Sequence, residues 1–187
     1  LAAGMLFAGA VSSCSDIDEQ DRFEYIKPAD AARKVLIEDF TGQKCVNCPK
    51  ATDEIHHLQE TYGEDNVIAV GIHSGPLGYK GTKKNPGLMT DLGNVYYYNW
   101  GLDHQPVGLV NRGKPSDYPY WQEQVAQLIT QKAPLSLAIH NAYDAASRTV
   151  TITIDAEGTT GTTKGKLQVW LIEDGITAMQ AMPDGST

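Results

Sequence analysis

The order of apolar and polar positions divides the first part of the chain into strands and helices. Residues 34–41 are rich in β-branched and aliphatic side chains, which predicts a buried strand. After Pro49 the apolar residues recur at spacings of four, three and four, the repeat of an amphipathic helix. These residues are Ala51, Ile55, Leu58 and Tyr62. Gly63 follows as the expected end of the helix.

Further elements of the same kind continue to residue 133. Residues 66–73 form a second apolar run, and a shorter one follows Pro106, so we expect two more strands. A last helix is predicted from the large apolar residues Trp121, Val125, Leu128 and Ile129. The insertion at residues 74–104 begins as a loop and continues into an aromatic-rich helix. Its rings would form a substrate platform or a cover for the sheet, and we favour the cover because aromatic side chains dominate core packing.

The pattern changes after residue 133. Three segments alternate or run apolar, at residues 135–143, 149–155 and 166–173, and turn-forming residues separate them. We therefore expect antiparallel β structure over residues 134–187, the opening strands of an immunoglobulin-like sandwich. Because such a sandwich has about seven strands, we expect this domain to be truncated in the sequence.

The first residues have the pattern of an export signal. Residues 1–13 are apolar, close on small side chains and run directly into Cys14, although no basic segment precedes them. This run is too short to span a bilayer as a helix, and we expect that the start of the signal is missing. A buried helix with an incidental cysteine is the alternative. Residues 15–22 are polar and acidic, which favours a solvated tether after Cys14.

Composition and charge exclude several classes of partner. The chain of 187 residues is 41% hydrophobic, enough to bury a core. Its 15 basic and 23 acidic residues give a net charge of -8, and the basic residues are not clustered. This balance argues against nucleic-acid binding and against electrostatic docking on an anionic membrane. Membrane attachment must then be covalent or through a partner.

Two of the three cysteines form a Cys-x-x-Cys pair, Cys45 and Cys48, between the first strand and the first helix. A disulfide is permitted there if the protein is exported. Cys45 is expected near the first helical turn, where the helix dipole and the neighbouring Lys44 would stabilise a thiolate. We therefore predict Cys45 as the nucleophile and the more exposed thiol, and Cys48 as the resolving thiol.

Two other interpretations of the pair stay open. A zinc site needs four ligands, and the nearby His56 and His57 are adjacent, so they point to different faces of the helix. A disulfide that is only structural is the stronger alternative, although closing so short a loop removes little entropy from the unfolded chain. We predict no metal and no cofactor.

The region around the pair resembles thioredoxin-like proteins. Asp39 precedes Cys45 by six positions, the offset of the buried acid in thioredoxins, and Phe40 follows it as an aromatic residue does there. Pro106 stands before an apolar strand, where thioredoxins have a cis-proline facing the cysteines. The chain departs from thioredoxins at Lys44, where they have Trp, and at Val46-Asn47, where they usually have Gly-Pro. The resemblance implies a thioredoxin-like central sheet with flanking helices.

The order of segments along the whole chain resembles a family of envelope proteins. A small-residue run ending on Cys14 is similar to a bacterial lipobox, in which the cysteine is lipidated. The acidic residues after it resemble the surface signal of lipoproteins in Bacteroides-type bacteria. Together with residues 39–49 and 106–112, this order is similar to lipoproteins related to the twenty-eight-kilodalton outer-membrane protein of those bacteria. The resemblance implies an outer-membrane lipoprotein that is periplasmic or surface-exposed.

The sequence thus predicts four parts, a truncated signal with lipobox (1–14), an acidic tether (15–33), a thioredoxin-like domain (34–133) and a partial all-β sandwich (134–187). One hypothesis is a tethered thiol–disulfide oxidoreductase that uses Cys45, Cys48, Asp39 and Pro106. Its partners would be protein thiols or disulfides and, through a lipid on Cys14, the membrane, but not nucleic acid. The second hypothesis is a surface binding or adhesion module with a structural disulfide.

Overall fold

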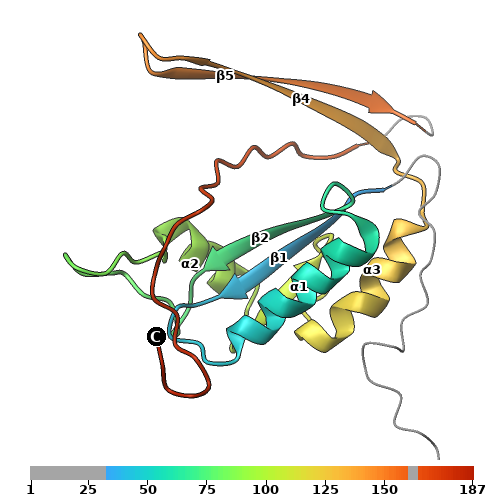
Figure 1. The fold of residues 1–187 in the computed structure, drawn as a ribbon. Helices are drawn as coiled ribbons and strands as arrows, with labels where there is room; N and C mark the ends of the chain where they lie inside the picture. The colour runs from blue at the N-terminus through green and yellow to red at the C-terminus, as the bar shows by residue number, and fades with distance from the viewer. Residues whose placement is uncertain (1–32, 160–163) are drawn as a thin grey trace, which may run out of the picture.

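The computed structural model describes residues 33–159 and 164–187, which form a mixed α/β structure with two sheets and three α-helices (Figure 1). The elements are β1 (Val35–Thr41), α1 (Cys48–Tyr62), β2 (Val67–His73), α2 (Asp91–Asn99), β3 (Val107–Val110), the 3-10 helix η2 (Tyr118–Tyr120), α3 (Trp121–Ile129), β4 (Leu135–Asp144) and β5 (Thr149–Gly158). The predicted lipidation site Cys14 and the tether up to residue 32 lie outside the described residues.

The first sheet has β1 at its centre, in the order β2-β1-β3. β2 runs parallel to β1 after the connection through α1, and β3 runs antiparallel to it. Both faces of β1 are covered, and all but one of its residues are buried. This explains why the β1 sequence is a nearly continuous apolar run and not a strict alternation.

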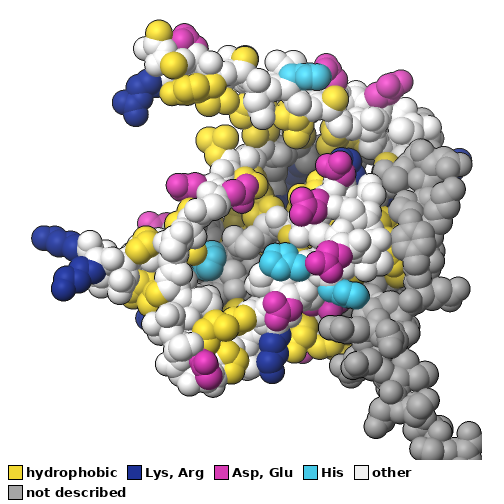
Figure 2. Space-filling view, in the orientation of Figure 1, with side chains coloured by type: hydrophobic (Ala, Val, Ile, Leu, Met, Phe, Trp, Pro, Cys, Tyr) yellow, Lys and Arg dark blue, Asp and Glu magenta, His cyan; other side chains and the backbone are white. Residues whose placement is uncertain are grey.

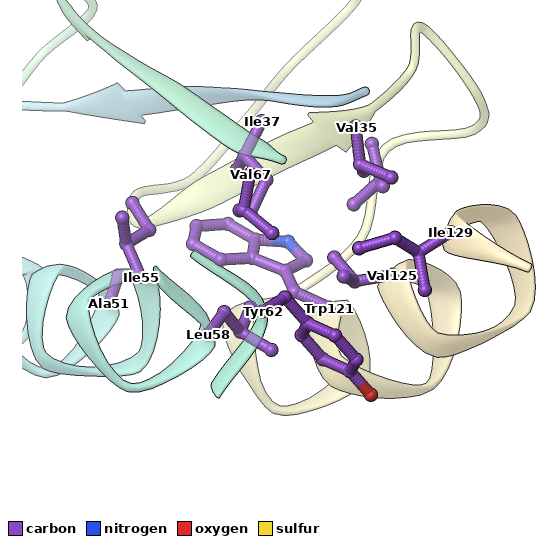
Figure 3. Close-up of a cluster of buried hydrophobic side chains, with 11 residues drawn as sticks. Val35, Ile37, Ala51, Ile55, Leu58, Tyr62, Val67, Trp121, Val125 and Ile129 are labelled. Atoms are coloured by element: carbon purple, nitrogen blue, oxygen red, sulfur yellow. The ribbon is translucent and has the colours of Figure 1, made fainter. Parts of the chain in front are cut away.

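One face of this sheet packs against α1 and α3. Figure 3 shows the indole of Trp121 among side chains from α1, α3 and the sheet, and Trp121 is fully buried. Its ring nitrogen donates a hydrogen bond to the carbonyl oxygen of Ser116 at 3.1 Å. The apolar residues that predicted the two helices line this core, namely Ala51, Ile55, Leu58 and Tyr62 from α1 and Val125 and Ile129 from α3.

The other face packs against α2 and the loop after it. Tyr97 is 1% exposed and meets Phe40 edge-on, with the ring centroids 6.3 Å apart. Ile72, Leu102, Val107 and Leu109 complete this second core. The favoured interpretation of the aromatic insertion, a cover for the sheet, is therefore confirmed for Tyr97, whereas Tyr98 is mainly exposed.

A buried acid on β1 is paired beside this second core. Glu38 is fully buried, and the Arg112 guanidinium donates two hydrogen bonds to its carboxylate, at 3.1 and 3.2 Å. The guanidinium also lies over the rings of Tyr96 and Trp170, 6.0 and 5.2 Å from their centroids. Trp170 comes from the C-terminal segment, so this cluster joins that segment to the α/β domain.

The second sheet is the antiparallel hairpin β4–β5, which Figure 1 shows apart from the first sheet. Its two strands confirm the predictions at residues 135–143 and 149–155. The predicted strand at residues 166–173 is wrong, because the structure forms no strand there. Its alternating side chains lack a partner strand, and Trp170 instead packs against Tyr96 with the ring centroids 5.5 Å apart. Among the described residues, no helix has both the length and the apolar character needed to cross a bilayer.

Candidate disulfide site

The Cys45–Cys48 pair forms a disulfide in the turn between β1 and α1, with an S–S distance of 2.09 Å. The backbone N–H of Cys45 donates to the carbonyl oxygen of Gly42 at 2.9 Å, which closes this turn. α1 begins at Cys48 and not near Cys45, with Pro49 in its first turn, where a missing N–H has no cost. Cys48 is therefore the cysteine at the helix N-terminus.

The exposure predicted for Cys45 is wrong. Cys45 and Cys48 are each 1% exposed. A segment from the far end of the chain lies beside them, with Gln180 Nε2 donating to the carbonyl oxygen of Cys45 at 2.8 Å. Lys44, expected to act on the thiolate, has its ammonium over the ring of Tyr79, 5.6 Å from the centroid.

Asp39 faces a cavity of about 520 Å³ that Cys48 also lines. Asp39 is 3% exposed, and its Oδ1 has no hydrogen-bond partner. Burial raises the pKa of Asp39 to about 7, because the charged form loses its hydration. An acid with such a pKa exchanges protons readily near neutral pH. The structure thus brings two predicted site residues, Asp39 and Cys48, to one cavity.

A polar residue that sequence reasoning missed lines the same cavity. His73 lies on β2 beside Thr41 of β1, and its buried Nδ1 has no partner. Burial lowers the pKa of His73, which favours the neutral imidazole. His56 lines the cavity from α1, and Figure 2 shows acidic and histidine side chains gathered along this helix. Gly71 pairs with Asp39, and His73 stands two residues after Gly71. Because side chains alternate along a strand, His73 and Asp39 lie on the same face of the sheet. This spacing was the signal for His73.

Pro106 lies directly before β3, and the Gln105–Pro106 peptide bond is cis, as the resemblance to thioredoxin-like proteins implies. The next residue, Val107, pairs with Phe40. The Gln105 side-chain amide donates to the carbonyl oxygens of Thr41, at 2.6 Å, and Ser74, at 2.9 Å. These bonds join the segment before Pro106 to the end of β1, but Pro106 itself does not line the cavity.

Gln43 is a second residue that sequence reasoning missed. It is 1% exposed, and its side-chain amide is fully used in hydrogen bonds to the backbone. Its Oε1 accepts from the N–H of Leu88 at 2.7 Å, and its Nε2 donates to the carbonyl oxygens of Pro86 and Met179. Gln43 therefore connects the disulfide turn to two distant segments.

Metal binding is one of the two alternative interpretations of the cysteine pair. Within residues 33–159 and 164–187, no three His, Cys, Asp or Glu side chains converge in a way that could hold a metal ion. His56 lines the cavity beside Cys48, but the cysteine sulfurs are bonded to each other.

Comparison with known proteins gives one match. No curated protein and no solved structure matches the chain. The family model described as outer membrane protein Omp28 matches residues 93–186, which is half of the chain. The matched residues run from α2 past Pro106 and Gln180 to Ser186 and do not include the cysteine pair. They confirm both the predicted relationship and the predicted location, and the chain belongs to the Omp28 family of outer membrane proteins of the cell envelope.

Proposed function

We propose that this outer membrane protein is a thiol–disulfide oxidoreductase with a thioredoxin-like domain. The observation that carries the proposal is the buried Asp39 carboxyl, with a pKa of about 7, in the cavity that Cys48 lines. A disulfide kept only for stability has no need of an unpaired buried acid beside it, because such an acid is costly to ionise.

The arrangement of elements supports the same proposal. The Cys-x-x-Cys pair lies between a central strand and the helix that follows, and β2 returns parallel to that strand. An antiparallel strand then begins directly after a cis-proline. α1 and α3 cover one face of the sheet and α2 covers the other. This arrangement supports the proposal of a thioredoxin-like domain.

We assign the first attack to Cys45, because Asp39 shares its cavity with Cys48 and can take the proton of that thiol in the second step. In the reduced protein, the Cys45 thiolate would attack one sulfur of a substrate disulfide. A mixed disulfide forms, and the other substrate sulfur leaves as a thiolate. Asp39 then accepts the proton of the Cys48 thiol, and the Cys48 thiolate attacks the Cys45 sulfur. The Cys45–Cys48 disulfide forms as the second substrate thiolate leaves, so two electrons pass to the substrate. The reverse sequence oxidises a substrate dithiol.

Oxidised glutathione provides a defined test of this chemistry. Reduced Cys48→Ser protein should accumulate one glutathione on Cys45, because the thiol that resolves the mixed disulfide is gone. Wild-type protein should instead end as the internal disulfide, and Cys45→Ser serves as the matched control for the order of attack. Intact-mass spectrometry distinguishes these products. If Cys48→Ser gains no adduct, and wild-type protein does not catalyse insulin reduction by dithiothreitol, the proposal is wrong.

The second candidate is a surface binding module with a structural disulfide. The burial of both cysteines favours it, as does the exposed β4–β5 hairpin, on which Leu137, Ile139 and Tyr143 are each more than half exposed. For either function we propose that Cys14 carries a lipid that holds the protein in the membrane. The small residues before Cys14 and the acidic residues after it support this.

A further inference from the structure

Residues 179–182 form a short strap beside the disulfide turn. The N–H of Ala181 donates to the carbonyl oxygen of Gln43 at 2.8 Å, and the carbonyl oxygen of Met179 accepts from Gln43 Nε2 at 3.0 Å. The strap therefore binds Gln43 through its own main chain. Figure 1 shows this part of the chain, in red, passing the start of α1.

Gln180, at the middle of the strap, makes contacts of a different kind. Its side-chain Nε2 donates to the carbonyl oxygen of Cys45 at 2.8 Å and lies 3.4 Å from that of Gly42. The strap thus uses main-chain groups and one amide side chain to bind residues 42–45. Because each of these bonds has a main-chain atom on at least one side, another extended peptide with suitable donors would satisfy the same groups.

The strap also lines the cavity beside the disulfide. Gln180 and Met182 line it together with Asp39 and Cys48. Residues 164–187 contain no helix or strand, so regular secondary structure does not hold the strap in place. Among the described residues, the Trp170 cluster and the contacts just described attach this segment to the α/β domain.

We propose that residues 42–45 and the adjoining cavity form a binding site for an extended peptide, and that the strap is its internal occupant, shielding the disulfide until a partner peptide displaces it. The partner is an extended segment that presents a main-chain N–H to Gln43 and an amide donor to the Cys45 carbonyl. That this partner is also the redox substrate rests on the proposed function. The occupancy of the site by the strap does not.

Accessibility of the disulfide in the full oxidised chain tests the proposal. Gln180→Glu places a carboxylate against two carbonyl oxygens, and Ala181→Pro removes the N–H that binds Gln43. Each loses at least one hydrogen bond of the strap, and we expect reduction of Cys45–Cys48 by a small phosphine to become about tenfold faster. Gln131→Glu, the same change at an exposed position on the loop after α3, should leave the rate unchanged.

Hydrogen exchange at the Ala181 amide gives an independent measurement in the wild-type protein. We expect this amide to exchange more slowly than in an unstructured peptide, and to lose its protection when a synthetic peptide of residues 177–183 is added in excess. Exchange at the unstructured rate, or unchanged reduction rates in both strap variants with intact circular dichroism, would overturn the proposal. If the strap variants react faster but Cys48→Ser traps no glutathione, the binding site stands and the oxidoreductase proposal fails. If instead Cys48→Ser traps glutathione but the strap variants are reduced at the wild-type rate, the oxidoreductase proposal stands and the strap proposal fails.

Discussion

Asp39 lies directly opposite Gly71 in the parallel pair of β1 and β2. Because Gly71 has no side chain, the space beside the carboxyl stays open, and both residues line the cavity that Cys48 shares. A Cβ placed on Gly71 would have the Thr41 methyl group as its nearest neighbour, at 3.8 Å. The buried acid is therefore open to the disulfide on one side and enclosed by the sheet and α1 elsewhere.

Asp39→Asn should change how stability depends on pH. Burial raises the folded-state pKa of Asp39 from 3.8 to about 7, so the folded state holds this proton more tightly than the unfolded state. Asp39 therefore contributes a loss of stability as pH rises from about 4 to about 7. We expect Asp39→Asn to be more stable than wild type at pH 8 by roughly 2–4 kcal/mol and about equally stable at pH 4. Urea unfolding of the oxidised proteins measures this difference.

Glu54 is a second acid whose titration affects the same measurement, so its own variant serves as a control. Burial also raises its pKa to about 7, and its Oε1 is buried without a partner, so it acts in the same direction. Glu54→Gln should remove only its own contribution, because Glu54 does not line the cavity beside Cys48. In the reduced protein, Asp39→Asn but not Glu54→Gln should slow the resolving step at neutral pH. Equal effects of the two substitutions would contradict the role given to Asp39.

Gly71→Ala and Gly108→Ala form a matched pair. At Gly108, a Cβ would lie 2.3 Å from a ring carbon of the fully buried Trp121. We therefore expect Gly108→Ala to lower the free energy of unfolding by about 3 kcal/mol, because the indole has no free space to enter. Gly71→Ala should cost less than about 1 kcal/mol. Thermal or urea unfolding compares them, and equal losses would mean that the space opposite Asp39 is not open.

Arg112→Ala should destabilise the protein through Glu38. The substitution leaves the Glu38 carboxylate, which is fully buried, without its two guanidinium hydrogen bonds. We expect the free energy of unfolding to fall by roughly 2–4 kcal/mol. This range allows for solvent screening, because the Arg112 side chain is itself 38% exposed. The double variant Glu38→Gln with Arg112→Ala should recover part of this loss, and Lys114→Ala is the control at an exposed neighbour. Strictly additive single-variant effects in this cycle would contradict the coupling.

His104 should titrate above the ordinary range of a histidine. Its Nδ1 lies 2.7 Å from Asp103 Oδ1 and its Nε2 lies 2.7 Å from Asp117 Oδ1. These two carboxylates raise the pKa of His104, Asp103 first. The ion pairs of protonated His104 stabilise the folded protein fully below pH 6.5, and this stabilisation disappears as pH rises through the raised pKa of His104. Asp117→Asn should lower the pKa of His104 without returning it fully to 6.5, and NMR titration of the ring measures it. Asp155→Asn, beside His140, should leave the His104 titration unchanged.

Cys14→Ala should release the protein from the membrane fraction when the complete gene is expressed. Without the thiol no lipid can be attached, and the acidic segment that follows is repelled by anionic lipid. Fractionation and metabolic labelling with a fatty acid provide the two measurements. An unlabelled wild-type protein would show that another attachment holds it in the envelope.

The apolar pattern by itself determined the elements that are held by burial. The spacing of Ala51, Ile55, Leu58 and Tyr62 predicted α1 because a helix with one buried face requires that repeat. The strands of both sheets and α3 followed from the same reasoning. The Cys-x-x-Cys pair, the acid at position 39 and the proline before β3 are local signals too, so their places in the fold were predictable.

Only the tertiary structure decided what lies over the disulfide. Gln43 and Met179 are 136 positions apart, and no periodicity in the sequence relates them. The alternation at residues 166–173 predicts a strand, but a strand forms only with a hydrogen-bonded neighbour, and Trp170 instead packs with Tyr96 and Arg112. The burial of Cys45 follows from the same long-range contacts. Local pattern selects an element through its own buried face, whereas contacts between distant segments depend on how the whole chain packs.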